Sequence, residues 1–223
     1  MHSYIIPITK KFKQHADAAK AASAKAYLLN QFGFHGLMTP ERRTLCREHY
    51  KQYPVTNLKE LEYIVKECFS LPQREYQYFA IELFAYHKKL WNPSSVKLME
   101  YCLLTKSWWD SVDHIVSQWL GPYFKLIPEK IIPITSKWNA SENRWLQRSS
   151  IIFQNAYKKD TDAELLSKYI LHCAGSKEFF IQKATGWALR EYSKTYPKWV
   201  KDFVKHHKLA PLSVREALKR IAR

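Results

Sequence analysis

The stretch NLKELEYIVKECFSL at residues 57–71 decides the fold class of this chain. Its apolar residues are Leu58, Leu61, Ile64, Val65, Cys68 and Leu71. At 3.6 residues per turn these positions share one stripe of an α-helix, which can face a core. Asn57 is a natural N-cap for that helix, and Pro72 cannot continue it. The pattern therefore predicts an amphipathic helix between these two residues.

The same helical spacing recurs along the rest of the chain, and sustained alternation of period two is not visible. Further helices are predicted over about residues 73–90, 92–104, 107–121, 141–157 and 176–194. The helix that begins at Ser107 is expected to end at Gly121 and Pro122. Ser213 followed by Glu216 has the spacing of a capping box, which predicts one more helix start near the C-terminus. The pattern indicates an all-α protein.

Short connections of about two to six residues imply that successive helices are antiparallel neighbours. Helical hairpins of about 35–40 residues that stack side by side would let each helix bury one face, as in HEAT-like repeats. We therefore predict an α-solenoid of HEAT-like helical hairpins with a basic concave face. A compact all-α globule is the alternative. No shift in composition marks a boundary, so we expect a single domain over residues 1–223.

The composition excludes several functional classes. The chain has 5 Gly, and none of them forms the G-x-G-x-x-G or P-loop pattern of nucleotide-binding folds. The 4 Cys are far apart, and the 9 His form no H-E-x-x-H pattern, so neither a metal nor a cofactor is expected. No apolar run reaches the roughly 20 residues of a membrane span. We expect a cytoplasmic protein with reduced cysteines.

The charge of the chain points to an anionic partner. The sequence has 36 Lys and Arg against 20 Asp and Glu, a formal net charge of +16. Residues 176–223 contain 12 of these cations and only 4 acidic residues. An excess of this size is tolerated when an anionic partner offsets it, and nucleic acid is the usual one. A cationic concave face of a solenoid would suit the backbone of a duplex.

A tryptophan–carboxylate pair stands out at residues 105–113, TKSWWDSVD. Trp109 and Asp113 are one helical turn apart and share a face. The adjacent Trp108 points about 100° away from Trp109, so the two indoles are not expected in the same core layer. One indole beside a carboxylate on a polar face resembles a site. The alternative is that both indoles are buried in the core and that Asp113 is solvated.

Arginines and aromatic residues form two further candidate surfaces. Arg144 and Arg148 share a helix face and could together grip phosphate, unless they are simply a solvated charged face. In the last long predicted helix, one stripe contains Phe179, Lys183, Trp187, Arg190 and Lys194. Cations interleaved with large aromatics suit sugar, base and phosphate together. Gly186 lowers helix stability relative to Ala, and we expect that its lack of a side chain permits close approach of a neighbouring element or a ligand.

Three motifs give the chain a strong resemblance to a known family. TKSWWDSVD at residues 105–113, WLQR at 145–148 and SKEFFIQKATGWALREY at 176–192 resemble the HEAT-like-repeat DNA glycosylases of the AlkD family. TPERR at residues 39–43 fits the same family. The resemblance implies an α-solenoid that holds duplex DNA on its concave face. It also implies a monofunctional alkylpurine DNA glycosylase, expected to be a monomer, that hydrolyses the N-glycosidic bond of N3- and N7-alkylated purines without flipping the base.

The resemblance also implies roles for individual residues. Asp113, Trp109 and Trp187 would be the catalytic set, and Arg148 the arginine of the site. Together, the resemblance and the stripe predict these DNA-binding residues: Arg148, Arg144, Lys183, Arg190, Phe179, Tyr27, Thr39 and Arg43. A cationic alkylpurine needs no general acid, whereas a carboxylate and two indoles can stabilise a cationic sugar. Two other functions stay open: a catalytically silent HEAT-like protein that binds damaged or distorted DNA, and a protein-interaction scaffold.

Overall fold

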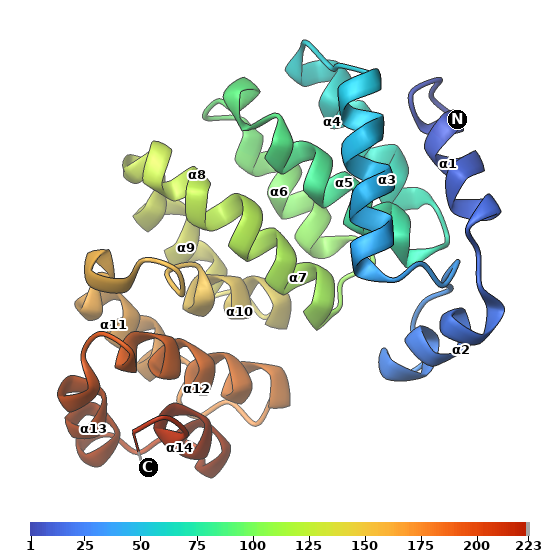
Figure 1. The fold of residues 1–223 in the computed structure, drawn as a ribbon. Coiled ribbons are helices and arrows are strands. Elements are labelled where there is room, and N and C mark those ends of the chain that lie inside the picture. The colour runs from blue at the N-terminus through green and yellow to red at the C-terminus, as the bar shows by residue number, and fades with distance from the viewer. Residues whose placement is uncertain (222–223) are drawn as a thin grey trace. The chain divides into compact units, whose positions relative to one another are not determined.

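The computed structural model describes residues 1–221, which form α-helices joined by short connections (Figure 1). Within this range the β-structure is limited to one isolated bridge between Gly33 and Gln73. No described helix combines the length and apolarity needed to cross a lipid bilayer. The predicted all-α class is therefore confirmed. The chain divides into two compact units, Met1–Leu98 and Met99–Arg223.

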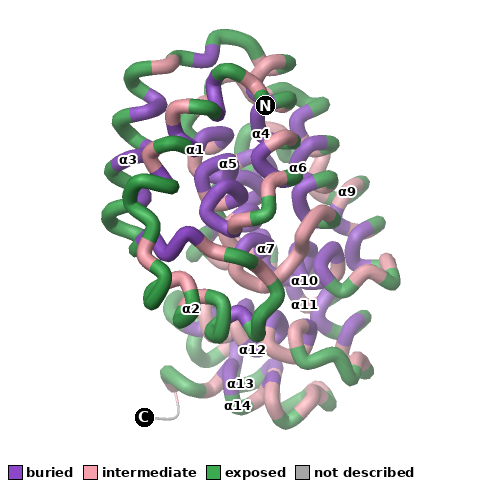
Figure 2. The backbone as a smooth tube through the Cα atoms, turned by 90° about the vertical axis from the view of Figure 1, so that its right-hand side faces the viewer, coloured by how far each residue is buried: buried purple, intermediate pink, exposed green. Residues whose placement is uncertain are grey.

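The first unit contains five α-helices and one short 3-10 helix. These are α1 (Ile5–Gln14), α2 (Ala18–Tyr27), α3 (Thr39–Gln52), α4 (Leu58–Ser70), α5 (Arg74–Tyr86) and η1 (Lys88–Leu90). Helix α5 contacts both α3 and α4, and α1 packs on α3. Helix α5 is buried over most of its surface, whereas α2 buries no side chain (Figure 2). Helix α5 is therefore the central helix of this unit.

Helix α4 is the helix predicted from residues 57–71. Asn57 is its N-cap, and the Asn57 side chain accepts a hydrogen bond from the backbone N–H of Glu60 at 2.8 Å. The middle of the apolar stripe is buried, as the spacing predicted: Leu61, Ile64, Val65 and Cys68 have no exposed surface, whereas Leu58 and Leu71 at its ends are half-buried. Helices α4 and α5 pack against each other as a helical hairpin, as expected for two amphipathic helices with a short connection.

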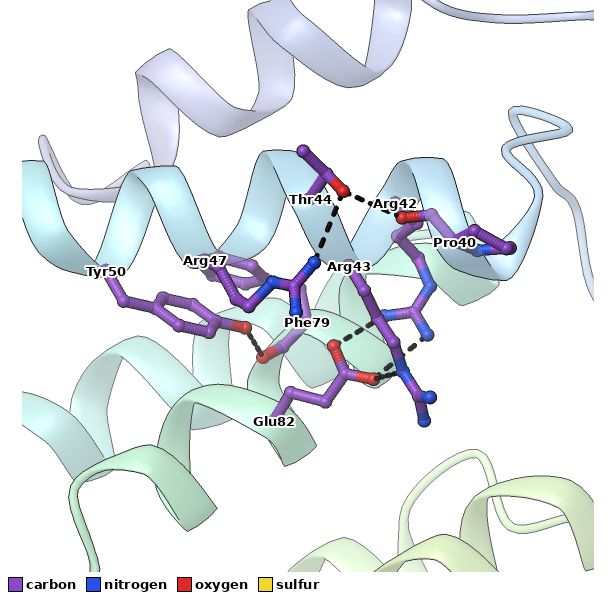
Figure 3. Close-up of polar contacts among 8 residues, drawn as sticks. All are labelled: Pro40, Arg42, Arg43, Thr44, Arg47, Tyr50, Phe79 and Glu82. Atoms are coloured by element: carbon purple, nitrogen blue, oxygen red, sulfur yellow. Dashed lines mark hydrogen bonds and ion pairs between the residues drawn. The ribbon is translucent and has the colours of Figure 1, made fainter.

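Polar contacts tie α3 to α5 in the first unit (Figure 3). The guanidinium of Arg42 donates two hydrogen bonds to the carboxylate of Glu82, at 3.0 and 3.1 Å. Arg43 donates to the same carboxylate from Nε at 3.0 Å. The Arg42 side chain is 4% exposed and the Arg43 side chain 54%. Arg42 is therefore a structural residue, and Arg43 presents its charge at the surface.

The helices of the second unit form two layers. After α6 (Ser95–Leu104), which spans the boundary between the units, they are α7 (Trp109–Ile115), η2 (Val116–Leu120), α8 (Gly121–Leu126), η3 (Pro128–Lys130), α9 (Ile131–Asn139), α10 (Arg144–Ile152), η4 (Lys158–Asp160), α11 (Ala163–His172), α12 (Phe179–Ser193), α13 (Pro197–His206) and α14 (Pro211–Leu218). One layer runs α7, α10, α12 and α14, each helix contacting the next, and α9 contacts α11 in the other. Such nearest-neighbour stacking defines a solenoid, which confirms the predicted fold class.

The predicted helix end at Gly121 and Pro122 is wrong. Helix α7 continues through a π-helical turn, η2, directly into α8, so Gly121 and Pro122 lie inside one continuous helical segment. Proline lacks the N–H that an α-helix interior needs, and the wider π turn changes the hydrogen-bond pattern just before it. A Cβ at position 121 would lie 3.2 Å from the carbonyl oxygen of Phe153, so Gly121 allows close packing here.

The predicted capping box at Ser213 is also wrong. Helix α14 begins two residues earlier, at Pro211, whose fixed φ suits the first helical turn. Ser213 therefore lies within α14, where its hydroxyl donates to the carbonyl oxygen of Gln182 at 2.9 Å. A tertiary contact between α14 and α12 uses the side chain that the sequence pattern assigned to capping.

Candidate active site in the second unit

One layer of helices supplies all the side chains of a cavity of about 330 Å³ in the second unit. Trp109 and Asp113 come from α7, Arg148 from α10 and Trp187 from α12. The complete lining is Trp109, Asp113, Arg148, Phe179, Phe180, Lys183, Trp187, Arg190 and Glu216. Because equivalent helices of successive hairpins lie side by side, residues far apart in sequence converge on this cavity.

The centre of the site is a two-pronged ion pair between Asp113 and Arg148. Arg148 donates from Nε to Oδ1 of Asp113 at 2.7 Å and from Nη2 to Oδ2 at 2.8 Å. Its Nη1 donates to the carbonyl oxygen of Phe180 at 2.7 Å. The side chains of Arg148 and Asp113 are 6% and 20% exposed. This arrangement fixes the orientation of the carboxylate, because both of its oxygens have a partner with defined geometry.

Burial and the ion pair act on Asp113 in opposite directions. Removal from water raises the pKa of the Asp113 carboxyl above its ordinary value, and the nearby Asp110 adds to this effect. The hydrogen bonds and charge of Arg148 lower that pKa and so favour the ionised form. Burial is the larger effect, so the net direction is a raised pKa, and the ion pair with Arg148 is what favours the ionised carboxylate. In that form the charge has little surrounding water and acts strongly on a developing positive charge.

The two adjacent tryptophans take different environments, as the sequence predicted. Trp109 lines the cavity, whereas Trp108 packs edge-on against Trp145 and Phe180, with ring centroids 5.8 and 5.3 Å apart. Trp108 thus helps to hold α7 against α10 and α12. Trp109 is left to present its indole at the site.

Trp187 is held from two sides. The guanidinium carbon of Arg148 lies 5.9 Å from the centroid of the Trp187 ring. The indole Nε1 donates to Oε1 of Glu191 at 3.3 Å. Trp187 and Asp113 also line a second cavity of about 800 Å³. These two side chains therefore lie where the two cavities adjoin.

Glu216 of α14 is the residue of this cavity that sequence reasoning assigned to another role. Its carboxylate pairs with Lys183 at 3.1 Å, Arg190 at 2.7 Å and Lys219 at 2.8 Å. Hydrogen bonds and charge from Lys219, and then from Lys183, lower the pKa of Glu216 to about 2. The sequence signalled Glu216 only as a partner of Ser213 in a capping box. In the structure it fixes two of the predicted DNA-binding cations.

Gly186 allows α14 to reach this position. A Cβ at Gly186 would lie 2.4 Å from the Cβ of Glu216 and 2.8 Å from the carbonyl oxygen of Ser213. The expectation that Gly186 allows close approach of a neighbour is therefore confirmed. The helix-weakening residue is required because any side chain there would push α14 away from α12.

Arg144 and Arg148 do not act as a pair in this structure. Arg144 is 46% exposed and bonds to Glu178 at 3.1 Å, whereas Arg148 turns inward to Asp113. That Arg148 also contacts a phosphate stays a prediction. Phe179, 57% exposed, lies beside Phe180 at the edge of the cavity and remains accessible to a ligand.

The remaining predicted residues belong to the first unit. Tyr27 is the last residue of α2 and is 71% exposed. Thr39 is the first residue of α3, also exposed, and Arg43 follows one turn later. Each therefore presents its side chain at the surface, and their contact with DNA stays a prediction.

Clusters that could bind a metal are not found among the described residues. No group of three or more His, Cys, Asp or Glu side chains within residues 1–221 has a suitable arrangement. Cys46, Cys68, Cys102 and Cys173 are all buried and unlinked. Burial raises the pKa of the thiols of Cys46, Cys68 and Cys173, which disfavours reactive thiolates.

Known proteins with related sequence or fold identify the family of this chain. A sequence model of the family described as DNA alkylation repair enzyme matches residues 8–221. The solved structure of a predicted DNA alkylation repair enzyme from Enterococcus faecalis shares 34% identity, covers 93% of this chain and 97% of its own, and has a TM-score of 0.88. AlkD2 from Streptococcus mutans shares the fold at 18% identity with a TM-score of 0.61, covering 82% of this chain and 88% of its own.

A further structure, smu.31 from Streptococcus mutans UA159, shares the fold at 18% identity with a TM-score of 0.62 and covers 94% of this chain and 98% of its own. No curated protein matches the chain. The family match spans nearly all of the chain and includes the helices that build the cavity. The chain belongs to the DNA alkylation repair enzyme family.

Proposed function

We propose that this protein is a monofunctional DNA glycosylase that hydrolyses the N-glycosidic bond of cationic N3- and N7-alkylated purines in duplex DNA. The observation that carries the proposal is the carboxylate of Asp113, oriented by Arg148 in a cavity that Trp109 and Trp187 also line. We place the protein in the cytoplasm, acting as a monomer on the DNA there.

The substrate class follows from what the site offers. A purine alkylated at N3 or N7 already carries a positive charge, so it leaves as a neutral base without being protonated. The remaining difficulty is the positive charge that develops on the deoxyribose as the bond to the base breaks. A fixed carboxylate stabilises such a charge with no reorganisation at the moment of reaction.

In the proposed reaction the bond between C1′ and the base nitrogen breaks, and its electron pair goes to the base. A water oxygen then forms a bond to C1′, and Asp113 positions that water and accepts its proton. The faces of Trp109 and Trp187 stabilise the cationic sugar further by cation–π attraction. Arg148 holds the carboxylate in place and favours its charged form.

Duplex binding would rest mainly on the sugar–phosphate backbone. In the second unit Lys183, Arg190 and Phe179 line the cavity, and Arg144 is exposed on α10. We assign backbone contacts to these residues and, in the first unit, to Tyr27, Thr39 and Arg43. Because the catalytic groups act on the sugar, the damaged base need not be flipped into a pocket.

The test is release of free 7-methylguanine from a methylated duplex under single-turnover conditions. We expect release by the native protein and a rate lower by roughly 10- to 1,000-fold for Asp113→Asn, which keeps the side-chain shape and removes the charge. Uracil and hypoxanthine should not be released, because nothing in the set of Asp113, Trp109 and Trp187 protonates a neutral leaving base. Duplex binding without any release would instead indicate a catalytically silent DNA-binding protein.

A further inference from the structure

The indole of Trp187 is the end of a short polar chain along α12. Its Nε1 donates to Oε1 of Glu191, one helical turn later, at 3.3 Å. The other oxygen of Glu191 pairs with Nζ of Lys194. The Glu191 side chain is 22% exposed and that of Lys194 is 41% exposed. All three residues line the cavity of about 800 Å³, which Asp113 also lines. These three linked side chains therefore lie beside the candidate active site.

The contacts that link Trp187, Glu191 and Lys194 restrict how the indole can move. A tryptophan side chain has two rotatable bonds, and a hydrogen bond at Nε1 selects one orientation of the ring. The acceptor is itself fixed, because Lys194 holds its second oxygen. On its other side the indole meets the guanidinium of Arg148, which is committed to Asp113. Trp187 therefore has a defined orientation relative to the catalytic carboxylate.

The charge of the acceptor matters as well as its position. A carboxylate that accepts a hydrogen bond from the indole N–H pushes electron density into the ring, which strengthens the negative potential of its face. The face of an electron-rich indole attracts a cation more strongly. A neutral amide at the same position would preserve the hydrogen bond but not this electrostatic effect.

We propose that Glu191 is a positioning residue that fixes the indole of Trp187 and strengthens its attraction for the positively charged sugar. This inference rests on the proposed glycosylase function. It assigns Glu191 a role that acts through a tryptophan and does not touch the substrate.

The test compares Glu191→Gln and Glu191→Ala with Glu164→Gln, an exposed carboxylate on α11 whose loss changes the net charge equally. Glu191→Gln should lower the single-turnover rate of 7-methylguanine release by about 3- to 10-fold while duplex affinity changes less than about 2-fold. Glu191→Ala should lower the rate further, because the ring also loses its orientation. Glu164→Gln should match the native protein.

Two measurements separate this inference from the proposed function. The first is the affinity of the protein for a duplex that contains a cationic pyrrolidine abasic analogue, divided by its affinity for a duplex that contains neutral tetrahydrofuran. Relative to the native protein, this ratio should fall in Glu191→Gln but not in Glu164→Gln. The second is the NMR resonance of the Trp187 indole N–H, assigned by its loss in Trp187→Phe, which should move upfield in Glu191→Ala. Neither readout requires catalysis. Native rate and native affinity ratio in Glu191→Gln, or an unshifted resonance, would overturn the role of Glu191.

Discussion

Replacing Arg148 with methionine tests how the site keeps its carboxylate charged. Methionine fills much of the same volume but can donate no hydrogen bond. In the native protein the guanidinium makes two bonds to Asp113, at 2.7 and 2.8 Å, and one to the carbonyl oxygen of Phe180. Arg148→Met therefore leaves a largely buried carboxylate and a backbone carbonyl without their partner.

The expected loss of stability can be estimated from this geometry. Removing one partner of a buried ion pair costs about 3–5 kcal/mol, mostly because the other charge is left uncompensated. For a protein of this size each kcal/mol corresponds to about 2–4 °C, so the Tm should fall by about 6–20 °C. The double variant Asp113→Asn/Arg148→Met should be more stable than Arg148→Met alone, because it contains no unpaired buried charge.

The same variant should change the pH dependence of excision. Arg148 opposes the rise in the pKa of Asp113 that burial causes. Without the guanidinium this pKa rises further, so the carboxylate becomes protonated at a higher pH. Since the proposed reaction needs the ionised form, the acidic limb of the single-turnover rate should shift toward neutral pH in Arg148→Met.

Thermal unfolding followed by circular dichroism, and 7-methylguanine release measured between about pH 5 and pH 9, check both effects. Arg148→Lys is the matched control, since it keeps a positive charge but not the two-pronged geometry, and should fall between the native protein and Arg148→Met. A well-folded Arg148→Met protein with native Tm and a native pH profile would refute the reasoning.

Three further predictions concern stability, each measured by denaturant unfolding. Gly186→Ala should destabilise by about 1–3 kcal/mol, because the new Cβ would overlap α14, whereas Gly175→Ala, with no atom within 4 Å, should not. Loss of hydration lowers the pKa of buried His49 to about 4. Between about pH 6.5 and pH 4 the unfolded state therefore binds a proton that the folded state does not, and the free energy of unfolding should fall by about 3 kcal/mol over this range. His49→Phe should abolish this contribution to the pH dependence. Glu216→Gln should lower the free energy of unfolding by about 2–3 kcal/mol at neutral pH. The native protein should lose the same stabilisation as pH falls from about 4.5 toward 2, where Glu216 becomes protonated. The duplex affinity of Glu216→Gln should rise, because Arg190 loses its carboxylate partner and can contact phosphate.

Local information in the sequence was sufficient for the all-α class and for several of its helices, although not for every helix boundary. The period of apolar residues at 57–71 and the cap at Asn57 predicted α4 nearly to the residue, since both depend on neighbours within one or two turns. The spacing of Trp109 and Asp113 placed them on one helix face for the same reason. The excess of positive charge, which needs no fold to be counted, indicated an anionic partner.

Tertiary structure decided which of these residues act together. Arg148 looked like a partner of Arg144, yet it bonds to Asp113, 35 positions away in sequence. Glu216 looked like part of a helix cap, yet it holds Arg190, 26 positions away. Stacked helical hairpins bring equivalent faces of successive helices together. A side chain such as Arg148 can then bond to a carboxylate on a neighbouring helix instead of acting with Arg144 on its own helix. Helical periodicity gives the face of each residue, but the choice of partner depends on charge and burial that exist only after the hairpins have packed.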